Sequence, residues 1–131
     1  MAHLFSFKTS LFDISREEPN DINPIAGQSV LFWLRDELVN AHYRVTEPAT
    51  EDWGWYIDVD GDHGSYLVGA SADADAAPPI EWMVQVDKLR SLKDKLLGKN
   101  RMEANDALSA LIERLIRADS RLELVEIDRD A

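Results

Sequence analysis

Three short runs in the middle of the chain alternate apolar and polar side chains, and this alternation constrains the fold more than any other feature. The runs span residues 53–59, 65–72 and 80–86. Because successive side chains of a strand point to opposite faces, each run predicts a strand with one apolar face. Asp60-Gly61 supplies the positive φ angles of a hairpin turn after the first run. We therefore expect an antiparallel meander, preceded by a short strand over residues 43–47.

Two segments flank the meander and carry the apolar spacing of α-helices. The first covers residues 24–41 and begins at Asn23-Pro24, a capping side chain followed by a residue without an amide proton. The second covers residues 104–118 and follows Asn100 and Glu103, which have capping-box spacing. The apolar stripes consist of Val30, Leu31, Leu34, Leu38 and Ala41 in the first helix, and of Ala104, Ala107, Leu108, Leu111, Leu115 and Ala118, widened by Ile112 and Ile116, in the second.

Further strands are expected at both ends of the chain, over residues 4–14 with a bulge or bend and over residues 122–127. A short helix over residues 89–97 ends at Gly98. These elements predict a single α+β domain over residues 1–131, in the order β-α-β-β-β-β-α-β. Its antiparallel sheet has about five strands, with two main helices packed on one face, because each helix has one apolar stripe and each strand one apolar side.

The first predicted helix has a second apolar stripe, formed by Ile25, Phe32 and Val39. Two interpretations are open. Another part of the chain covers this stripe, so that the helix is sandwiched, or the stripe contacts a second copy in a homodimer. The change Phe32→Glu separates them, because it dissociates a dimer in the second case and unfolds the protein in the first.

Acidic side chains outnumber basic ones, with 25 Asp and Glu against 14 Lys and Arg and a net charge of −11. Residues 1–80 hold 14 acidic and 4 basic side chains, whereas most of the basic ones of the remainder cluster between Lys88 and Arg101. This charge disfavours nucleic acid and anionic membranes as partners and favours a basic protein.

The chain has no cysteine, which excludes disulfides, thiolate catalysis and cysteine-based metal sites. Its first residues lack a basic segment followed by a long apolar run, so we expect no signal peptide. No window is long and apolar enough to span a bilayer. These features favour a cytoplasmic protein.

Motifs for catalysis or metal binding are scarce. The histidines are far apart in sequence, at His3, His42 and His63, and neither a Gly-x-Ser-x-Gly elbow nor a glycine-rich phosphate loop occurs. Residues 58–64 look like the start of a calcium loop, but His63 and Gly69 occupy the positions where glycine and an acid are required. We therefore name no catalytic residue, metal site or cofactor.

The most distinctive run is Glu51-Asp52-Trp53-Gly54-Trp55. Alternation places Trp53 and Trp55 on one strand face, which Trp82 can join from another strand. Carboxylates and aromatic faces both attract cations, so this group is a candidate surface for a basic partner. In the alternative interpretation both tryptophans are core. The run resembles a stretch of small uncharacterised bacterial proteins, a resemblance that covers the middle third of the chain and implies no activity.

Three functions follow as hypotheses. The first is a small acidic protein-binding module, an inhibitor or immunity-like partner of a basic protein, which binds through Glu51, Asp52, Trp53, Trp55 and Trp82. The second is a small-molecule-binding domain or small enzyme with a pocket between sheet and helices, lined by aromatic side chains that include Tyr66, with Asp58 or His63 as polar groups. The third is a self-associating structural protein.

Overall fold

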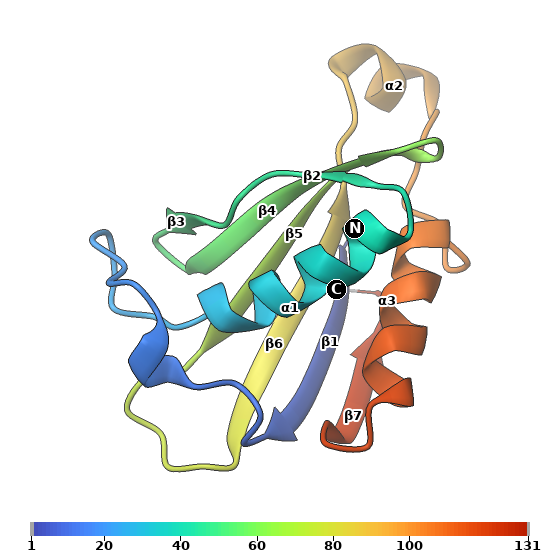
Figure 1. Cartoon of the computed structure of the whole chain (residues 1–131). Coiled ribbons are helices and arrows are strands. Elements are labelled where there is room, and N and C mark those ends of the chain that lie inside the picture. The colour runs from blue at the N-terminus through green and yellow to red at the C-terminus, as the bar shows by residue number, and fades with distance from the viewer. Residues whose placement is uncertain (1, 131) are drawn as a thin grey trace.

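The alternating runs pair into one antiparallel sheet of seven strands in the computed structural model, which describes residues 2–130 (Figure 1). The predicted meander is confirmed as three long consecutive strands. In chain order the strands are β1 (Ala2–Thr9), β2 (Arg44–Val45), β3 (Ala49–Glu51), β4 (Gly54–Gly61), β5 (Gly64–Ala72), β6 (Ile80–Lys88) and β7 (Glu123–Asp128).

The strands lie side by side in the order β2-β4-β5-β6-β1-β7, and β3 also pairs with β4. The first and last strands of the chain are therefore neighbours, with β1 between β6 and β7. The sheet has seven strands where the predicted order β-α-β-β-β-β-α-β has six, because the residues around Pro48 form two short strands where one was predicted. β2 pairs with one end of β4 and β3 with the other.

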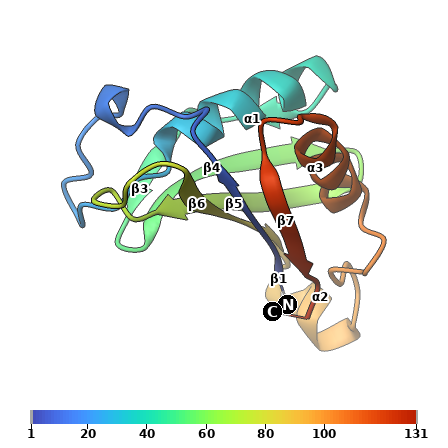
Figure 2. The same ribbon diagram turned by 90° about the horizontal axis from the view of Figure 1, so that it is seen from below.

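Two main helices, α1 (Gln28–Asn40) and α3 (Ala107–Ala118), lie on the same face of the sheet, which confirms the predicted α+β class (Figures 1 and 2). A 3₁₀ turn, η1 (Ile14–Arg16), precedes α1. The short helix α2 (Leu92–Leu97) extends away from the rest of the molecule, on the side of the sheet opposite to α1 (Figures 1 and 2). None of the helices within residues 2–130 is long and apolar enough to cross a membrane.

The first helix begins at Gln28, not at Pro24 as predicted. The intervening backbone is extended, because Ala26 forms an antiparallel bridge with Ala72 at the end of β5. The N-terminus is capped from a distant loop instead of by Asn23. The carboxylate of Glu17 accepts hydrogen bonds from two backbone amides of the first turn, Gly27 N at 3.0 Å and Ser29 N at 2.9 Å.

The prediction that Asn100 and Glu103 cap α3 is also wrong. The helix begins at Ala107, and the side chain of Asp106 accepts the amide hydrogen bond of Ser109 at 3.1 Å. Residues Asn100 to Asn105 instead belong to the connection from α2 to α3.

The covered face, which we define as the side of the sheet under α1 and α3, forms the core. Its largest fully buried side chains include Trp82, Tyr66, Phe5, Phe7, Leu31, Leu34, Leu38, Leu108, Ile112 and Ile116. Burial of this much apolar surface is the main favourable contribution to folding. The second stripe of α1 lies outside this core.

The interpretation in which that second stripe is sandwiched is wrong. Phe32 and Val39 are 42% and 45% exposed. Ile25 precedes α1, is half-buried, and lines a pocket to which neither Phe32 nor Val39 contributes. Phe32 and Val39 thus remain available to solvent, and contact with a second copy through them stays a prediction.

Candidate functional site

The side of the sheet that faces away from α1 and α3, here called the open face, is covered by no helix of residues 2–130 (Figure 2). The strand register determines which side chains share this face. One row across the strands joins Tyr56, Gly69, Gln85, Leu4 and Asp128, the next joins Ser71, Met83, Ser6 and Glu126, and a third joins Asp58, Leu67 and Asp87. The apolar side chains of Leu67 and Met83 thus lie on the two central strands of the open face, β5 and β6, beside Gly69 and Gln85.

Carboxylates surround this apolar middle. The strand positions of the open face carry Asp58, Asp60, Glu81, Asp87, Glu126 and Asp128. Two cations lie among them, Lys8 opposite Glu81 and Arg44 at the edge, where the Arg44 guanidinium is 4.0 Å from the Asp60 carboxylate. The open face therefore has strong negative potential around an apolar centre.

Trp53 lies on the open face because of the turn between β3 and β4. Asp52 and Trp53 are the two turn residues, and Gly54 follows with a φ of +148° that non-glycine residues rarely adopt. The Trp53 ring lies over Gly69, where an added Cβ would be 2.4 Å from the ring. Trp55 points to the covered face and is 3% exposed. The prediction that Trp53 and Trp55 share one strand face is therefore wrong.

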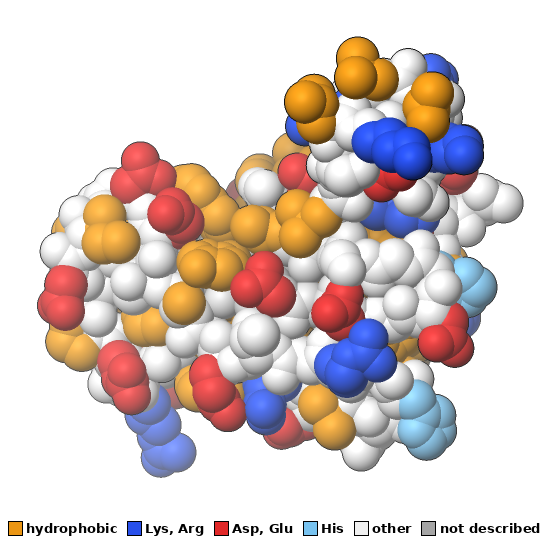
Figure 3. All heavy atoms as spheres, turned by 90° about the horizontal axis from the view of Figure 1, so that it is seen from above, with side chains coloured by type: hydrophobic (Ala, Val, Ile, Leu, Met, Phe, Trp, Pro, Cys, Tyr) orange, Lys and Arg blue, Asp and Glu red, His pale blue; other side chains and the backbone are white. Residues whose placement is uncertain are grey.

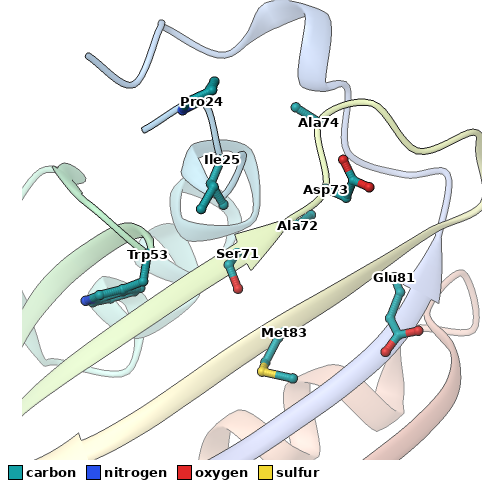
Figure 4. A pocket seen from close by; sticks show the side chains of 9 residues that line it. All are labelled: Pro24, Ile25, Trp53, Ser71, Ala72, Asp73, Ala74, Glu81 and Met83. Atoms are coloured by element: carbon teal, nitrogen blue, oxygen red, sulfur yellow. The ribbon is translucent and has the colours of Figure 1, made fainter. Parts of the chain in front are cut away.

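A pocket of about 460 Å³ opens beside Trp53 (Figure 4). In the close-up, Trp53, Ile25 and Met83 approach it from three different segments, with the Glu81 carboxylate at its margin. Its full lining consists of Pro24, Ile25, Trp53, Ser71, Ala72, Asp73, Ala74, Glu81 and Met83. The volume falls within the range of small-ligand sites, and an apolar wall with acidic side chains at its margin suits a side chain that is apolar along its stem and cationic at its end.

Two asparagines in the loop before α1 hold the Trp53 turn in place. The side-chain amide of Asn20 donates to Glu51 O at 3.1 Å and to Gly54 O at 2.9 Å. That of Asn23 donates to Asp52 O at 2.8 Å. Both sides of the turn are thus bound to a loop that Glu17 attaches to α1, so the position of Trp53 depends on three segments distant in sequence.

The predicted binding residues do not form one surface. Trp55 and Trp82 are in the core, 3% and 0% exposed. Glu51 and Trp53 are half-buried at the margin of the open face, and Asp52 is exposed in the turn. The aromatic residues expected to line one pocket between sheet and helices are not brought together. Trp55 and Trp82 pack into the core, Trp53 lines the pocket at the open face, and Tyr66 lines a separate pocket of about 440 Å³ together with Asp58.

Met83, Leu67 and Glu81 belong to the open face but were not predicted as site residues from the sequence. Met83 is 41% exposed although both of its neighbours in sequence are buried. The signal was present, since Met83 has the same parity as Glu81 and Gln85 in a strand whose other parity is apolar. An apolar residue on the polar side of an alternating strand is a feature to single out.

A second polar cluster lies on the covered face and joins α3 to the sheet. The Tyr66 hydroxyl donates to Asp106 Oδ1 at 2.7 Å, and Lys88 Nζ lies 3.8 Å from the same oxygen. His3 Nδ1 is 2.5 Å from Ser109 Oγ. Burial, together with the Asp106 carboxylate, raises the pKa of Tyr66, and burial lowers the pKa of His3.

This cluster contains a serine, a histidine and an aspartate but has no opening for a substrate. His3 is 0% exposed, Ser109 1% and Asp106 6%. A nucleophile must reach a substrate carbonyl, and Ser109 Oγ is enclosed between helix and sheet. The hydrogen bonds of the cluster instead satisfy the polar groups that α3 buries.

No group of three or more histidine, cysteine or acidic side chains that could hold a metal ion occurs within the described residues. Asp60, the third residue of the calcium-like run, pairs with Arg44 and lies beside Ser65 Oγ. Asp62 and His63 form the two-residue turn between β4 and β5. The run is therefore a hairpin, as predicted, but Asp60 and Gly61 are not its turn: they end β4, and the positive φ of +133° lies at Gly64.

Comparisons with known proteins found no matching family model, no matching curated protein and no matching solved structure.

Proposed function

We propose that this protein is a protein-binding module and that its open face binds a basic segment of a partner protein that also carries apolar side chains. The observation that supports this proposal is the composition of the open face: apolar side chains at Trp53, Leu67 and Met83, surrounded by carboxylates. Nothing in the fold requires exposed apolar groups there, since the core lies on the covered face.

The two components of the face have different roles in binding. The carboxylates attract a basic partner over distance and increase the association rate. The apolar centre contributes affinity once water is expelled, and a tryptophan beside a pocket is a typical interface anchor. Glu51 and Asp52 extend the negative potential along the turn, whereas Trp55 and Trp82 are buried on the covered face and support the sheet from that side.

A cytoplasmic partner fits the absence of cysteine.

The test is capture of partners by the tagged protein from a lysate at low and at physiological salt. We compare the wild type with Glu81→Lys/Glu126→Lys, which reverses two open-face charges, and with Asp36→Lys/Glu103→Lys, which makes the same charge change away from that face. A basic protein retained by the wild type and by the control pair, but released by the open-face pair, supports the proposal. Equal retention by all three proteins would contradict it.

A small-molecule ligand is the second candidate, favoured by the pocket of about 460 Å³ beside Trp53. It predicts a saturable change in tryptophan fluorescence with members of a panel of metabolites, and loss of that change in Trp53→Phe. A saturable change that persists in Trp53→Phe would exclude this pocket as its source.

A further inference from the structure

The segment of residues 89–101, here called the arm, contains α2 and leaves the body of the molecule at the end of β6 (Figure 1). Its three helix leucines are unusually exposed for their type: Leu92 is 74%, Leu96 78% and Leu97 56% exposed. In the space-filling view, apolar and basic side chains occur together on this projection, and an apolar hollow separates it from the rest of the molecule (Figure 3).

The arm is held in shape by its own hydrogen bonds. Ser91 and Asp94 form a capping box, and Gly98 ends the helix in the left-handed conformation. The Arg90 side chain donates to Lys99 O at 3.0 Å and to Asp94 O at 3.2 Å, which ties the two ends of the arm together. The leucines are thus presented on a small ordered unit, so less conformational entropy is lost when they bind.

The arm has the charge opposite to that of the rest of the chain. It holds five basic side chains and one acidic one, a net charge of +4. Because the whole chain carries −11, the remaining residues carry −15. A segment with basic and leucine side chains is the kind of ligand that the open face suits.

We propose that the partner of the open face is the arm of a second copy of this chain, in a reciprocal dimer in which Leu92 and Leu96 bind at the Trp53 pocket. This inference rests on the proposed function, since it names the occupant of the same face. The arm projects on the open-face side of the sheet (Figure 2). Two copies that face each other with their open faces therefore bring each arm toward the other copy, and a two-fold arrangement closes without forming filaments.

Charge complementarity supports this occupant over an unrelated leucine-rich segment. Lys93 and Lys95 lie next to the leucines, and Glu81 and Asp73 line the pocket. Two copies of net charge −11 repel each other at long range, but the Debye length of about 8 Å at 0.15 M salt suppresses that repulsion more than the contacts within the interface. The dimer is therefore expected at physiological ionic strength.

The test is sedimentation of the full chain at 0.15 M salt over a wide concentration range. We expect a monomer–dimer equilibrium in the wild type and at least a tenfold weaker one in Leu92→Glu/Leu96→Glu, whose positions are too exposed to affect folding. Lys93→Glu/Lys95→Glu and Glu81→Lys/Glu126→Lys should each weaken dimerisation by a similar factor. The four changes combined in one chain should restore it to within about threefold, because the charges are then exchanged.

Phe32→Glu is the control for the other exposed apolar site and should leave the equilibrium unchanged. A wild-type chain that stays monomeric at all concentrations, or a dimer that Phe32→Glu dissociates and the leucine changes do not, would overturn the inference. Neither outcome affects the proposed function, which fails only if the open-face charge reversal leaves the retention of every captured protein unchanged, untagged copies of this chain included. A zero-length cross-link between an arm lysine and Glu81, formed across isotopically distinct copies, would locate the contact directly.

Discussion

The covered and open faces of the sheet differ most clearly within one strand. In β6, Trp82, Val84 and Val86 are fully buried under the helices. Between them, Met83 is 41% exposed, and Gln85 and Asp87 are half-buried on the open face. The same backbone therefore carries side chains that fold the protein on one side and side chains that folding does not require on the other.

The two faces of the sheet indicate two different reasons for an apolar side chain on a strand, packing in the core and contact with a partner. Large apolar groups on the covered face are explained by core packing. An apolar group such as Met83, which is 41% exposed on the open face, gains little from folding and is better explained by binding. Substitutions on the two faces should therefore affect different measurements.

Neighbouring residues of β6 give the largest expected contrast. Trp82→Ala removes a fully buried indole from contact with Phe12, whose ring centroid is 5.5 Å away, and should lower the free energy of unfolding by about 4 kcal/mol. Met83→Ala, one position away, should change it by no more than about 0.5 kcal/mol. Urea denaturation measures both. Similar losses for the two changes would show that the open face is also part of the core.

The buried cluster at the start of α3 gives the next largest effect. Asp106→Ala removes the helix cap and leaves Lys88, whose side chain is 12% exposed, without its carboxylate, so we expect a loss of about 3 kcal/mol. Asp106→Asn keeps a capping side chain and should cost less. Asp87→Ala, an acid on the open face, serves as control and should cost no more than about 0.5 kcal/mol. A loss for Asp106→Ala that only equals the control would mean that the cluster does not stabilise the helix.

His3 makes the covered face sensitive to pH. Burial lowers the pKa of His3 below its ordinary value of 6.5, and its Nε2 is buried without an acceptor among the described residues, so the folded protein disfavours the imidazolium form. The unfolded chain takes up this proton at higher pH than the folded one. The contribution of neutral His3 to the free energy of unfolding is therefore fully present above pH 6.5. It decreases as the pH falls below that value, by at most about 1.4 kcal/mol per pH unit.

Melting temperatures between pH 7.5 and about pH 5 measure this effect. His3→Gln should flatten the dependence, and His63→Gln, a change of the exposed hairpin histidine, should leave it as in the wild type. Carboxyl groups with lowered pKa values, such as Asp119 beside Arg121, lose their contribution to stability as the pH falls through their ordinary value of 3.8, so they affect only the acidic end of this range. An unchanged slope in His3→Gln would assign the dependence to other groups.

Elements defined by local periodicity were predictable from the sequence. The meander over β4, β5 and β6 follows from period-two alternation, and the helical stripe at Leu31, Leu34 and Leu38 is buried as expected. Both signals arise from the geometry of a single strand or helix, so no knowledge of the partner element is required.

Features set by distant contacts were not predictable in this way. The cap of α1 comes from Glu17, and the start of α3 depends on Asp106, which Tyr66 and Lys88 also contact. Trp53 and Trp55 have the same parity, yet a turn ends the strand between them and sends Trp53 to the other face. The composition of the candidate site was thus visible in the sequence, but its assembly depends on the strand register.

Apart from the control and comparison substitutions, the smallest expected effect on stability concerns the position of Trp53 itself. Gly69→Ala adds a Cβ 2.4 Å from the Trp53 ring, so the ring must move away from the sheet. Because the atoms involved are at the far end of a side chain that is half-buried, we expect a stability loss of about 1 kcal/mol or less. Acrylamide quenching of fluorescence should increase relative to the wild type, and the increase should disappear in a Trp53→Phe background. Ser71→Ala, two positions along β5, is the control and should leave quenching unchanged.

If the open face binds its partner through Trp53, Gly69→Ala should weaken binding while the fold is retained, whereas full binding by this variant would assign the affinity to Met83 and the carboxylates.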